Sequence, residues 1–289
     1  SLPEFSAGAH IDLHLANGLI RQYSLCDYPV QNNAYSIAVL REDESRGGSH
    51  YIHDGLKVGD TVEISEPRNL FPLAEQQNRA LLFAGGIGIT PLIAMFEALL
   101  QQGIEVKLYY FCRSEADAAF LERLQQADAN GKVEICYQSP RTSPELLWRI
   151  IEEPAEGLHL YTCGPLGFMY AVFQTAKAKG WQAVHLHREL FKAATIDESA
   201  NQPFQIQIAS DGTVIDVPAD KSITQVLEEY GYFVPVSCEE GICGTCLTNL
   251  LSGDVLHRDQ FLTEEERREG KIFTPCCSRA RSGMLILEM

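Results

Sequence analysis

The chain has 289 residues, of which 45% are hydrophobic and 21% charged. This length and composition suit two or three globular domains, each with a core of its own. A net charge of -16 would repel phosphate backbones, so nucleic acid is not an expected partner. Gly and Pro interrupt the longest apolar run, RALLFAGGIGITPLIAMFEALLQ, and no membrane span is predicted. The nine cysteines do not form a secreted disulfide framework, which favours a reducing, cytoplasmic location.

Residues 1–75 contain short alternating runs, namely HIDLHL, RQYSLC, YSIAVLRE and DTVEIS. Turn-rich pieces separate them, as in an antiparallel sheet. The pattern predicts a small antiparallel β-barrel. Because a barrel must close and the pattern begins abruptly, a first strand is expected to be missing from this sequence.

Residues 76–191 alternate apolar strand-like runs with segments of helical periodicity. The strand-like runs are RALLFAG, EVKLYYFC, KVEICYQ, LHLYTCG and AVHLHREL. This alternation predicts a Rossmann-like α/β domain with a parallel sheet covered on both faces.

A glycine loop follows the first of these strands, in LLFAGGIGITP. Gly86, Gly88 and Pro91 occupy the places of the three glycines in a dinucleotide fingerprint, Thr90 is the expected N-cap, and Pro91 the first helical residue. Amides at that helix start would bind a pyrophosphate, although a tight strand–helix turn is the alternative. YTCGP ends the fourth strand at the same carboxyl edge, where parallel sheets bind ligands. No histidine base is evident beside Cys163, which is read as a buried thiol.

Residues 192–202 are polar and aperiodic and predict a linker, followed by a domain over residues 203–289. Asp211-Gly212 between two alternating runs predicts a hairpin, and Ser222 with Gln225 predicts a capping box.

Three cysteines lie close together in SCEEGICGTC: Cys238, Cys243 and Cys246. The C-x4-C-x2-C spacing is that of plant-type [2Fe-2S] sites, whereas zinc sites more often pair two short spacings. Gly241 and Gly244 would let the backbone curl around such a cluster. The fourth ligand is Cys276 or Cys277, and neighbouring side chains of an extended segment point to opposite faces, so spacing leaves the choice open.

Several of these motifs resemble known families. The C-terminal region resembles plant-type ferredoxins of β-grasp fold, and PCCSRA fits their pattern with Cys276 as the ligand. GGIGITP, YTCGP and the preceding RQYSL resemble the ferredoxin reductase superfamily. The order of flavin barrel, nucleotide domain and C-terminal ferredoxin resembles the phthalate dioxygenase reductase family, with its vanillate demethylase and carnitine monooxygenase reductases.

The resemblance implies roles for individual residues. Ser24, Glu189 and Phe191, the last two in HRELF, would form the hydride-transfer environment. The implied FMN contacts are Arg21, Gln22, Tyr23, Ser24, Ala38, Val39, Leu40, Arg46, Gly47, Gly48, Ser49 and Thr90. The implied NAD contacts are Gly86, Gly88, Thr90, Pro91, Arg113, Cys163, Gly164 and Pro165. His257-Arg258-Asp259 also matches the family but receives no chemical role, and a structural role is favoured.

The implied activity is that of an oxygenase reductase, which passes electrons from NADH through FMN and a [2Fe-2S] cluster to a terminal oxygenase with Rieske and mononuclear iron centres. The residues alone do not exclude FAD. Arg113 and Ser114 would accept the 2′-phosphate of NADPH, while Glu115 and Asp117 would repel it, so NADH is favoured. A redox sensor or carrier without NADH turnover and a zinc-stabilised nucleotide-binding module are the alternatives.

Overall fold

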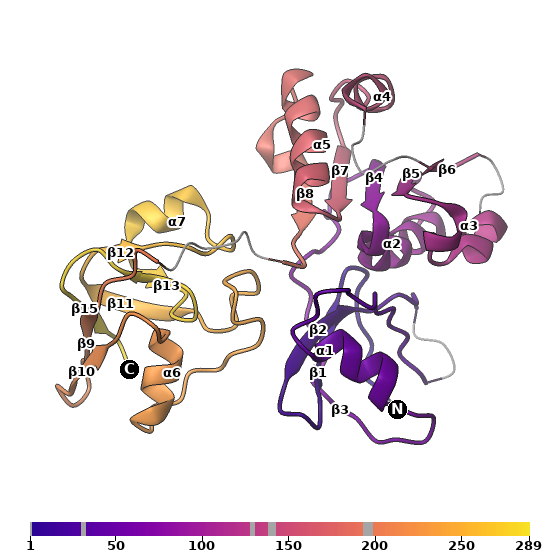
Figure 1. Cartoon of the computed structure of the whole chain (residues 1–289). Helices are drawn as coiled ribbons and strands as arrows, with labels where there is room; N and C mark the ends of the chain where they lie inside the picture. Colours follow the sequence, from indigo (N-terminus) through magenta and orange to yellow (C-terminus); the bar gives the residue numbers. More distant parts are fainter. Residues whose placement is uncertain (1, 30–32, 128–130, 138–142, 193–198) are drawn as a thin grey trace. The chain divides into compact units, whose positions relative to one another are not determined.

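A computed structural model gives the fold and describes residues 2–29, 33–127, 131–137, 143–192 and 199–289. Contacts divide the chain into two units, Ser1–Phe191 and Lys192–Met289, whose elements are labelled in Figure 1. Of the expected linker, residues 193–198 lie outside the described residues. Among the described helices, none combines the length and apolar character of a membrane span.

The first unit begins with a small antiparallel sheet of order β2-β1-β3. Its strands are β1 (His10–His14), β2 (Ile20–Ser24) and β3 (Glu63–Ile64). Ile11 and Leu13 of β1 are buried with Leu25 in a core of their own. This register leaves Ser24, opposite His10, at the last position of β2.

The alternating run 35–42 does not form a strand, contrary to the sequence prediction. Its backbone instead meets a helical segment, α1 (Gly48–His50) continued by a π-helical turn (Tyr51–Gly55). The imidazole nitrogens of His53 and His50 lie 2.8 Å from the Val39 carbonyl and 2.7 Å from the Glu42 carbonyl. Side chains therefore satisfy carbonyls that a neighbouring strand would otherwise bond.

The rest of the first unit is a parallel sheet of order β6-β5-β4-β7-β8, which confirms the predicted α/β arrangement. Its strands are β4 (Arg79–Gly85), β5 (Glu105–Cys112), β6 (Val133–Tyr137), β7 (Leu158–Cys163) and β8 (Leu186–Glu189). The chain order reverses between β4 and β7, so the carboxyl ends of these two strands lie at a topological switch point.

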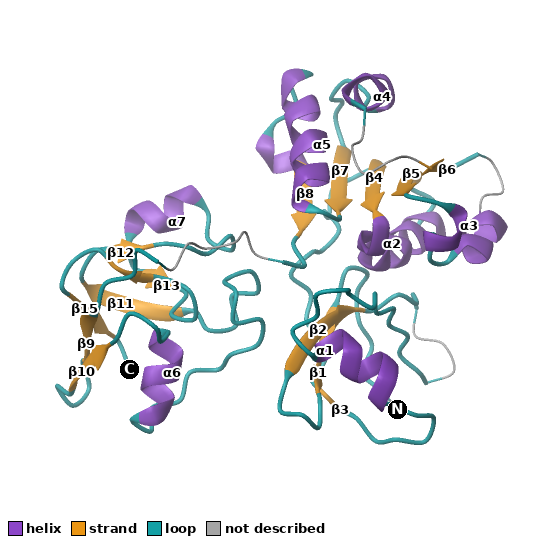
Figure 2. Cartoon of the chain, in the orientation of Figure 1, coloured by secondary structure: helices purple, strands orange, loops and turns teal. Residues whose placement is uncertain are grey.

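Helices cover both faces of this sheet (Figures 1 and 2). Leu82 packs into a core with α2 (Ile89–Gln101) and α3 (Leu121–Ala127). Its neighbour Phe83 packs into a second core with α4 (Pro144–Ile150) and α5 (Leu166–Ala178). Successive strand residues thus point alternately into two cores, one on each face of the sheet. This explains why the strands are almost continuously apolar.

The second unit contains a five-stranded sheet of order β10-β9-β15-β11-β13 and a two-stranded sheet, β12-β14. The predicted hairpin and capping box are both present, because Gly212 has a φ of 77° and Ser222 and Gln225 cap each other. The elements are β9 (Phe204–Ile208), β10 (Val214–Val217), α6 (Ile223–Glu229), β11 (Thr248–Ser252), β12 (Val255–Leu256), α7 (Glu264–Glu269), β13 (Ile272–Phe273), β14 (Arg279–Ala280) and β15 (Met284–Leu287).

Arg123 of α3 ties three segments of the first unit together. Its guanidinium lies 2.6 Å from an oxygen of Asp27 and 2.5 Å from an oxygen of Glu97, and it donates to the Cys26 carbonyl at 3.0 Å. All three charged side chains are less than one third exposed. The residues after β2 are thereby joined to α2 and α3.

Replacing this arginine by Arg123→Met should lower the free energy of unfolding of the first unit by about 2 kcal/mol, because two part-buried carboxylates lose their counter-charge. Urea unfolding followed by tryptophan fluorescence measures this unit, since both tryptophans, Trp148 and Trp181, belong to it. Arg41→Met is the matched control, because its ion pair with Asp54 is exposed on both sides. Equal unfolding midpoints for the two variants would refute the role of Arg123.

Candidate functional site

Two glycine-bearing strand ends meet at the switch point of the parallel sheet. A Cβ on Gly88 would collide with the Cys163 carbonyl, and a Cβ on Gly164 would lie 2.9 Å from the Gly85 Cα. Gly86, with a φ of 54°, has open space where its Cβ would be. The backbone of the glycine loop is therefore packed directly against the backbone of YTCGP. Gly86 faces open space, so a ligand could approach its backbone closely.

The helix after this loop starts earlier than the sequence predicted. A 3₁₀ turn (Gly86–Gly88) runs directly into α2, so Gly88 is the N-cap in place of Thr90. The buried Thr90 hydroxyl donates to the Ile87 carbonyl at 3.0 Å instead of accepting from an amide. Pro91 lies inside the first turn of α2. Helix geometry thus begins inside the glycine motif itself.

Arg21 lies against the 45–49 loop. Its Nη2 donates to the Arg46 carbonyl at 3.0 Å, and a Cβ on Gly48 would lie 2.7 Å from the Arg21 side chain. The Ser49 hydroxyl is hydrogen-bonded at 2.9 Å to that of Ser45. The Arg21 guanidinium thus adjoins a glycine turn that leads into α1. A positive side chain beside such backbone amides is an arrangement that can bind a phosphate.

Ser24 and Glu189, far apart in the sequence, meet across the first unit. The Ser24 hydroxyl donates to Oε2 of Glu189 over 3.4 Å. Burial raises the pKa of the Glu189 carboxyl to about 8, and the Ser24 hydrogen bond opposes this shift. The residue keeps part of its surface exposed although protein surrounds its carboxyl group. Glu189 therefore holds its proton at neutral pH.

Other predicted contacts lie around these groups. Burial raises the pKa of Tyr23, and Gln22 lies 3.4 Å from His10. Phe191 is 37% exposed, as a ring available to cover a ligand would be. Ala38 packs on the core beside α2, while Leu40 is exposed.

The predicted nucleotide contacts differ in exposure. Arg113 follows β5 and is exposed, and the next residue, Ser114, donates its hydroxyl to Asp117 at 2.7 Å. Pro165 is the N-cap of α5. Burial raises the pKa of Cys163 well above its ordinary value, so this thiol is neutral and is a packing group.

A cavity of about 850 Å³ lies away from these residues, beside His159 near the amino end of β7. Next to it His159 Nδ1 is 2.9 Å from His187 Nε2, and burial lowers the pKa of His187 to about 4. The sequence analysis did not single out these histidines. Because ligands of open parallel sheets bind at the carboxyl edge, this cavity is not part of the nucleotide site.

The cysteine loop runs between α6 and β11 and is drawn as irregular chain in Figure 2. Gly241 and Gly244 have φ values of 72° and 69°, so both adopt the left-handed conformation that the curl requires. The Glu240 amide donates to the Cys238 sulfur at 3.4 Å and the Thr245 amide to the Cys243 sulfur at 3.5 Å. Such amides stabilise negative charge on sulfur ligands.

The four expected ligands come together as two pairs. The thiol of Cys238 lies beside that of Cys243, and the thiol of Cys246 beside that of Cys276, which also adjoins Cys277. Cys277 lies behind the loop, where a Cβ on Gly241 would collide with its sulfur. Four thiols with the C-x4-C-x2-C spacing are a donor set that fits a [2Fe-2S] cluster.

Comparisons with known proteins match this architecture. The family model of the 2Fe-2S iron-sulfur cluster binding domain matches residues 206–281, and that of the dimethylamine monooxygenase subunit DmmA-like N-terminal domain matches residues 66–186. Vanillate O-demethylase oxidoreductase of Pseudomonas sp. (strain HR199 / DSM 7063) is 48% identical, over 100% of this chain and 91% of its own. The heme-dependent oxidative N-demethylase beta subunit of Ectopseudomonas mendocina (strain ymp) is 39% identical, and the match covers 100% of this chain and 91% of that protein.

Among solved structures, phthalate dioxygenase reductase is described as a modular structure for electron transfer from pyridine nucleotides to [2Fe-2S]. It is 37% identical with a TM-score of 0.75, over 100% of this chain and 89% of its own. The whole-chain match confirms the predicted fold class, an antiparallel flavin barrel, a Rossmann-like parallel sheet and a [2Fe-2S] ferredoxin domain. The chain therefore belongs to the phthalate dioxygenase reductase family of oxidoreductases that supply oxygenase systems.

Proposed function

We propose that this chain is the reductase component of an oxygenase, with flavin in residues 1–75, NADH in residues 76–191 and a [2Fe-2S] cluster in residues 203–289. When bound, the flavin would accept an electron pair from NADH and release single electrons to the cluster. The observation that carries this proposal is the contact between Ser24 and Glu189. It joins the end of the predicted flavin strand to the end of the last strand of the nucleotide sheet.

The residues of the chain would supply binding and orientation. Gly86, which has open space where a Cβ would be, leaves room for a pyrophosphate at the start of α2. Arg21 and the amides of residues 47–49 would hold the flavin phosphate. FMN is proposed over FAD because the chain belongs to the phthalate dioxygenase reductase family. The proton held by Glu189 keeps negative charge away from the reacting groups. Phe191, being exposed, would shield the flavin from water.

NADH is proposed over NADPH because of the segment after β5. Ser114 donates its hydroxyl to Asp117 and is thereby engaged. The carboxylates of Asp117 and Glu115 would repel a 2′-phosphate, although Arg113 offers a positive charge.

The partner is proposed to be a terminal oxygenase with Rieske and mononuclear iron centres, which suits the relationship to vanillate O-demethylase oxidoreductase. A heme-dependent demethylase component is the second candidate. The 39% identity to the heme-dependent oxidative N-demethylase beta subunit favours it. We propose a cytoplasmic location because Cys26, Cys112, Cys136 and Cys163 are buried free thiols.

Anaerobic titration of the purified full chain with NADH tests the function. The visible absorption of flavin and cluster should bleach within seconds, and NADPH should act far more slowly. Adding a Rieske oxygenase or a heme-dependent demethylase should restore the colour with the true partner only. A coloured protein that neither nucleotide bleaches would be a sensor or carrier, and a colourless protein containing zinc would reject the proposal.

The ligand assignment predicts opposite outcomes for two adjacent cysteines. Cys276→Ser should lose the [2Fe-2S] absorption and electron paramagnetic resonance signals, because Cys276 pairs with Cys246. Cys277→Ser should keep the cluster, since the Cys277 sulfur packs behind Gly241. Iron and sulfide analysis of both variants measures this directly, and the reverse pattern would make Cys277 the ligand.

The raised pKa of Glu189 predicts how pH affects flavin reduction. The carboxyl is protonated below about pH 8 and ionised above it, where its charge would oppose the arrival of an electron pair. The stopped-flow rate of flavin bleaching by NADH should therefore fall as pH rises from 7 to 9. Glu189→Gln should flatten this fall, whereas the exposed control Glu63→Gln should retain it. A fall of equal size in Glu189→Gln would assign the titration to another group.

The same pKa has a consequence for stability. The pKa of the Glu189 carboxyl is about 8 in the folded state, compared with an ordinary value of 4.5. The folded state therefore binds more protons than the unfolded state between pH 4.5 and about 8. The stabilising effect of that proton is fully present below pH 4.5 and is lost as pH rises through 8. Thermal unfolding of Glu189→Gln across this range should lack that loss, which provides a control independent of NADH.

A further inference from the structure

The motif His257-Arg258-Asp259 lies directly behind the cysteine loop. Arg258 donates to the Asn201 side chain at 2.7 Å and so holds the start of the described part of the second unit after residue 198. Asp259 has no exposed side-chain surface. A fully buried carboxylate is costly and needs compensation from its surroundings.

Three groups surround the Asp259 carboxylate. The Leu262 amide donates to Oδ2 at 2.8 Å. Arg267 lies 3.3 Å from the same oxygen and also donates to the Asp259 carbonyl at 2.6 Å. His257 Nδ1 is 3.4 Å from Oδ1, and in the described residues that oxygen has no partner in hydrogen-bonding geometry. The carboxylate is thus only partly compensated.

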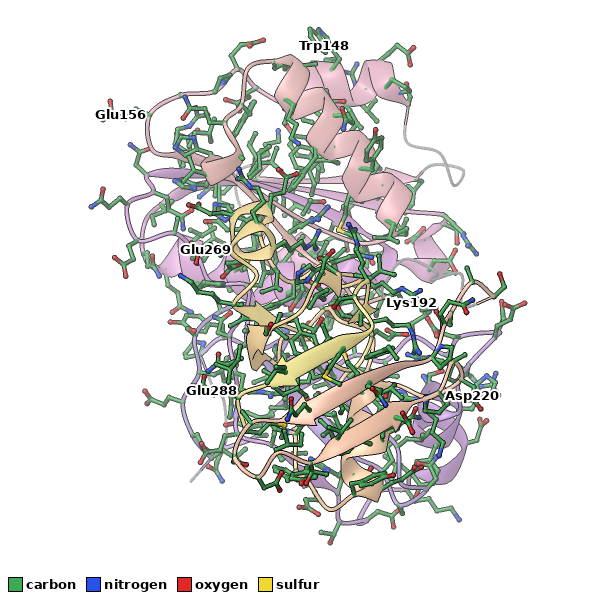
Figure 3. All side chains as sticks on the ribbon, turned by 90° about the vertical axis from the view of Figure 1, so that its left-hand side faces the viewer. Trp148, Glu156, Lys192, Asp220, Glu269 and Glu288 are labelled. Atoms are coloured by element: carbon green, nitrogen blue, oxygen red, sulfur yellow. The ribbon has the colours of Figure 1, made fainter. Side chains whose placement is uncertain are left out.

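The helix α7, whose last residue Glu269 is labelled in Figure 3, fixes the position of Arg267. Thr263 and Glu266 form a capping box at its start, with the Thr263 amide donating to Glu266 at 2.8 Å. The sequence carries this Thr-x-x-Glu pattern. The arginine therefore projects from a fixed turn of helix and not from a loose loop.

The segment that begins at Asp259 also supports both glycines of the cysteine loop. A Cβ on Gly241 would lie 2.9 Å from the Asp259 Cα, and a Cβ on Gly244 would collide with the Phe261 ring. The Gln260 amide donates to the Gly241 carbonyl at 2.9 Å. Gly241 lies between the expected ligands Cys238 and Cys243 in the sequence. Only the backbone of this loop would therefore separate Asp259 from the proposed cluster.

We propose that Asp259 is a positioning residue for the cluster loop, and that its buried charge, partly balanced by Arg267, lowers the reduction potential of the cluster. The inference rests on the proposed [2Fe-2S] function of the second unit. A negative charge in a water-poor place opposes the addition of an electron, and a nearby guanidinium favours it. A single electron enters and leaves the cluster, and no bond is made or broken.

Equilibrium redox titration of the purified full chain, read by the electron paramagnetic resonance signal of the reduced cluster, tests this. At the wild-type midpoint, Asp259→Asn should raise the ratio of reduced to oxidised cluster on the order of tenfold, as one charge about 10 Å away would at an effective dielectric constant of about 20. Arg267→Met should lower the ratio.

Matched controls lie on the same helix. Glu265→Gln and Arg268→Met remove the same charges from exposed positions, where water screens them, and should leave the midpoint unchanged. If Asp259→Asn and Glu265→Gln behave alike with the cluster intact, the proposed effect of the charge is wrong.

Loss of the cluster in Asp259→Asn would support the positioning role, provided that Asp259→Glu restores it. The effect of the charge would then be decided by Arg267→Met, and an unchanged midpoint in that variant would overturn it. A wild-type chain without [2Fe-2S] signals would instead refute the proposed function on which the inference rests.

Discussion

The nucleotide end of the molecule depends on the close approach of two backbone segments at the switch point of the parallel sheet. Gly88 touches the Cys163 carbonyl and Gly164 touches Gly85, so neither contact would survive a Cβ. Because β4 and β7 are neighbours in the sheet, this contact fixes where α2 starts. It also leaves Gly86 facing open space. The same sheet carries β8, whose last residue, Glu189, meets Ser24.

The cysteine loop of the second unit also depends on glycines that pack closely against a neighbouring segment. Gly241 and Gly244 allow the loop to lie on Asp259 and Phe261, and the amides of the loop then face its own sulfurs. In both places a glycine lacks a side chain, so backbone groups would adjoin the cofactor that we propose there. Backbone donors are held by the fold and need little rearrangement when charge arrives.

The sequence predicted most of the parallel sheet because each strand is a nearly continuous apolar run between helices. It mispredicted residues 35–42, whose alternation is real but whose carbonyls are satisfied by His50 and His53. It placed the helix cap at Thr90 because a hydroxyl before proline is a common signal, whereas the 3₁₀ turn already bonds the Ile89 amide and the Thr90 hydroxyl donates to the Ile87 carbonyl. These outcomes depend on tertiary partners, which no local pattern contains.

Two buried carboxyl groups, those of Glu189 and Asp259, lie along the electron path that we propose. Glu189 has only a hydroxyl beside it, so burial raises its pKa and the group stays neutral at pH 7. Asp259 has a guanidinium and an amide beside it, which compensate a buried charge. In this proposed path, the neutral Glu189 would keep negative charge away from the place where electrons enter as a pair. Where single electrons leave, a retained negative charge would favour release to the partner, so the two sites treat the same functional group in opposite ways.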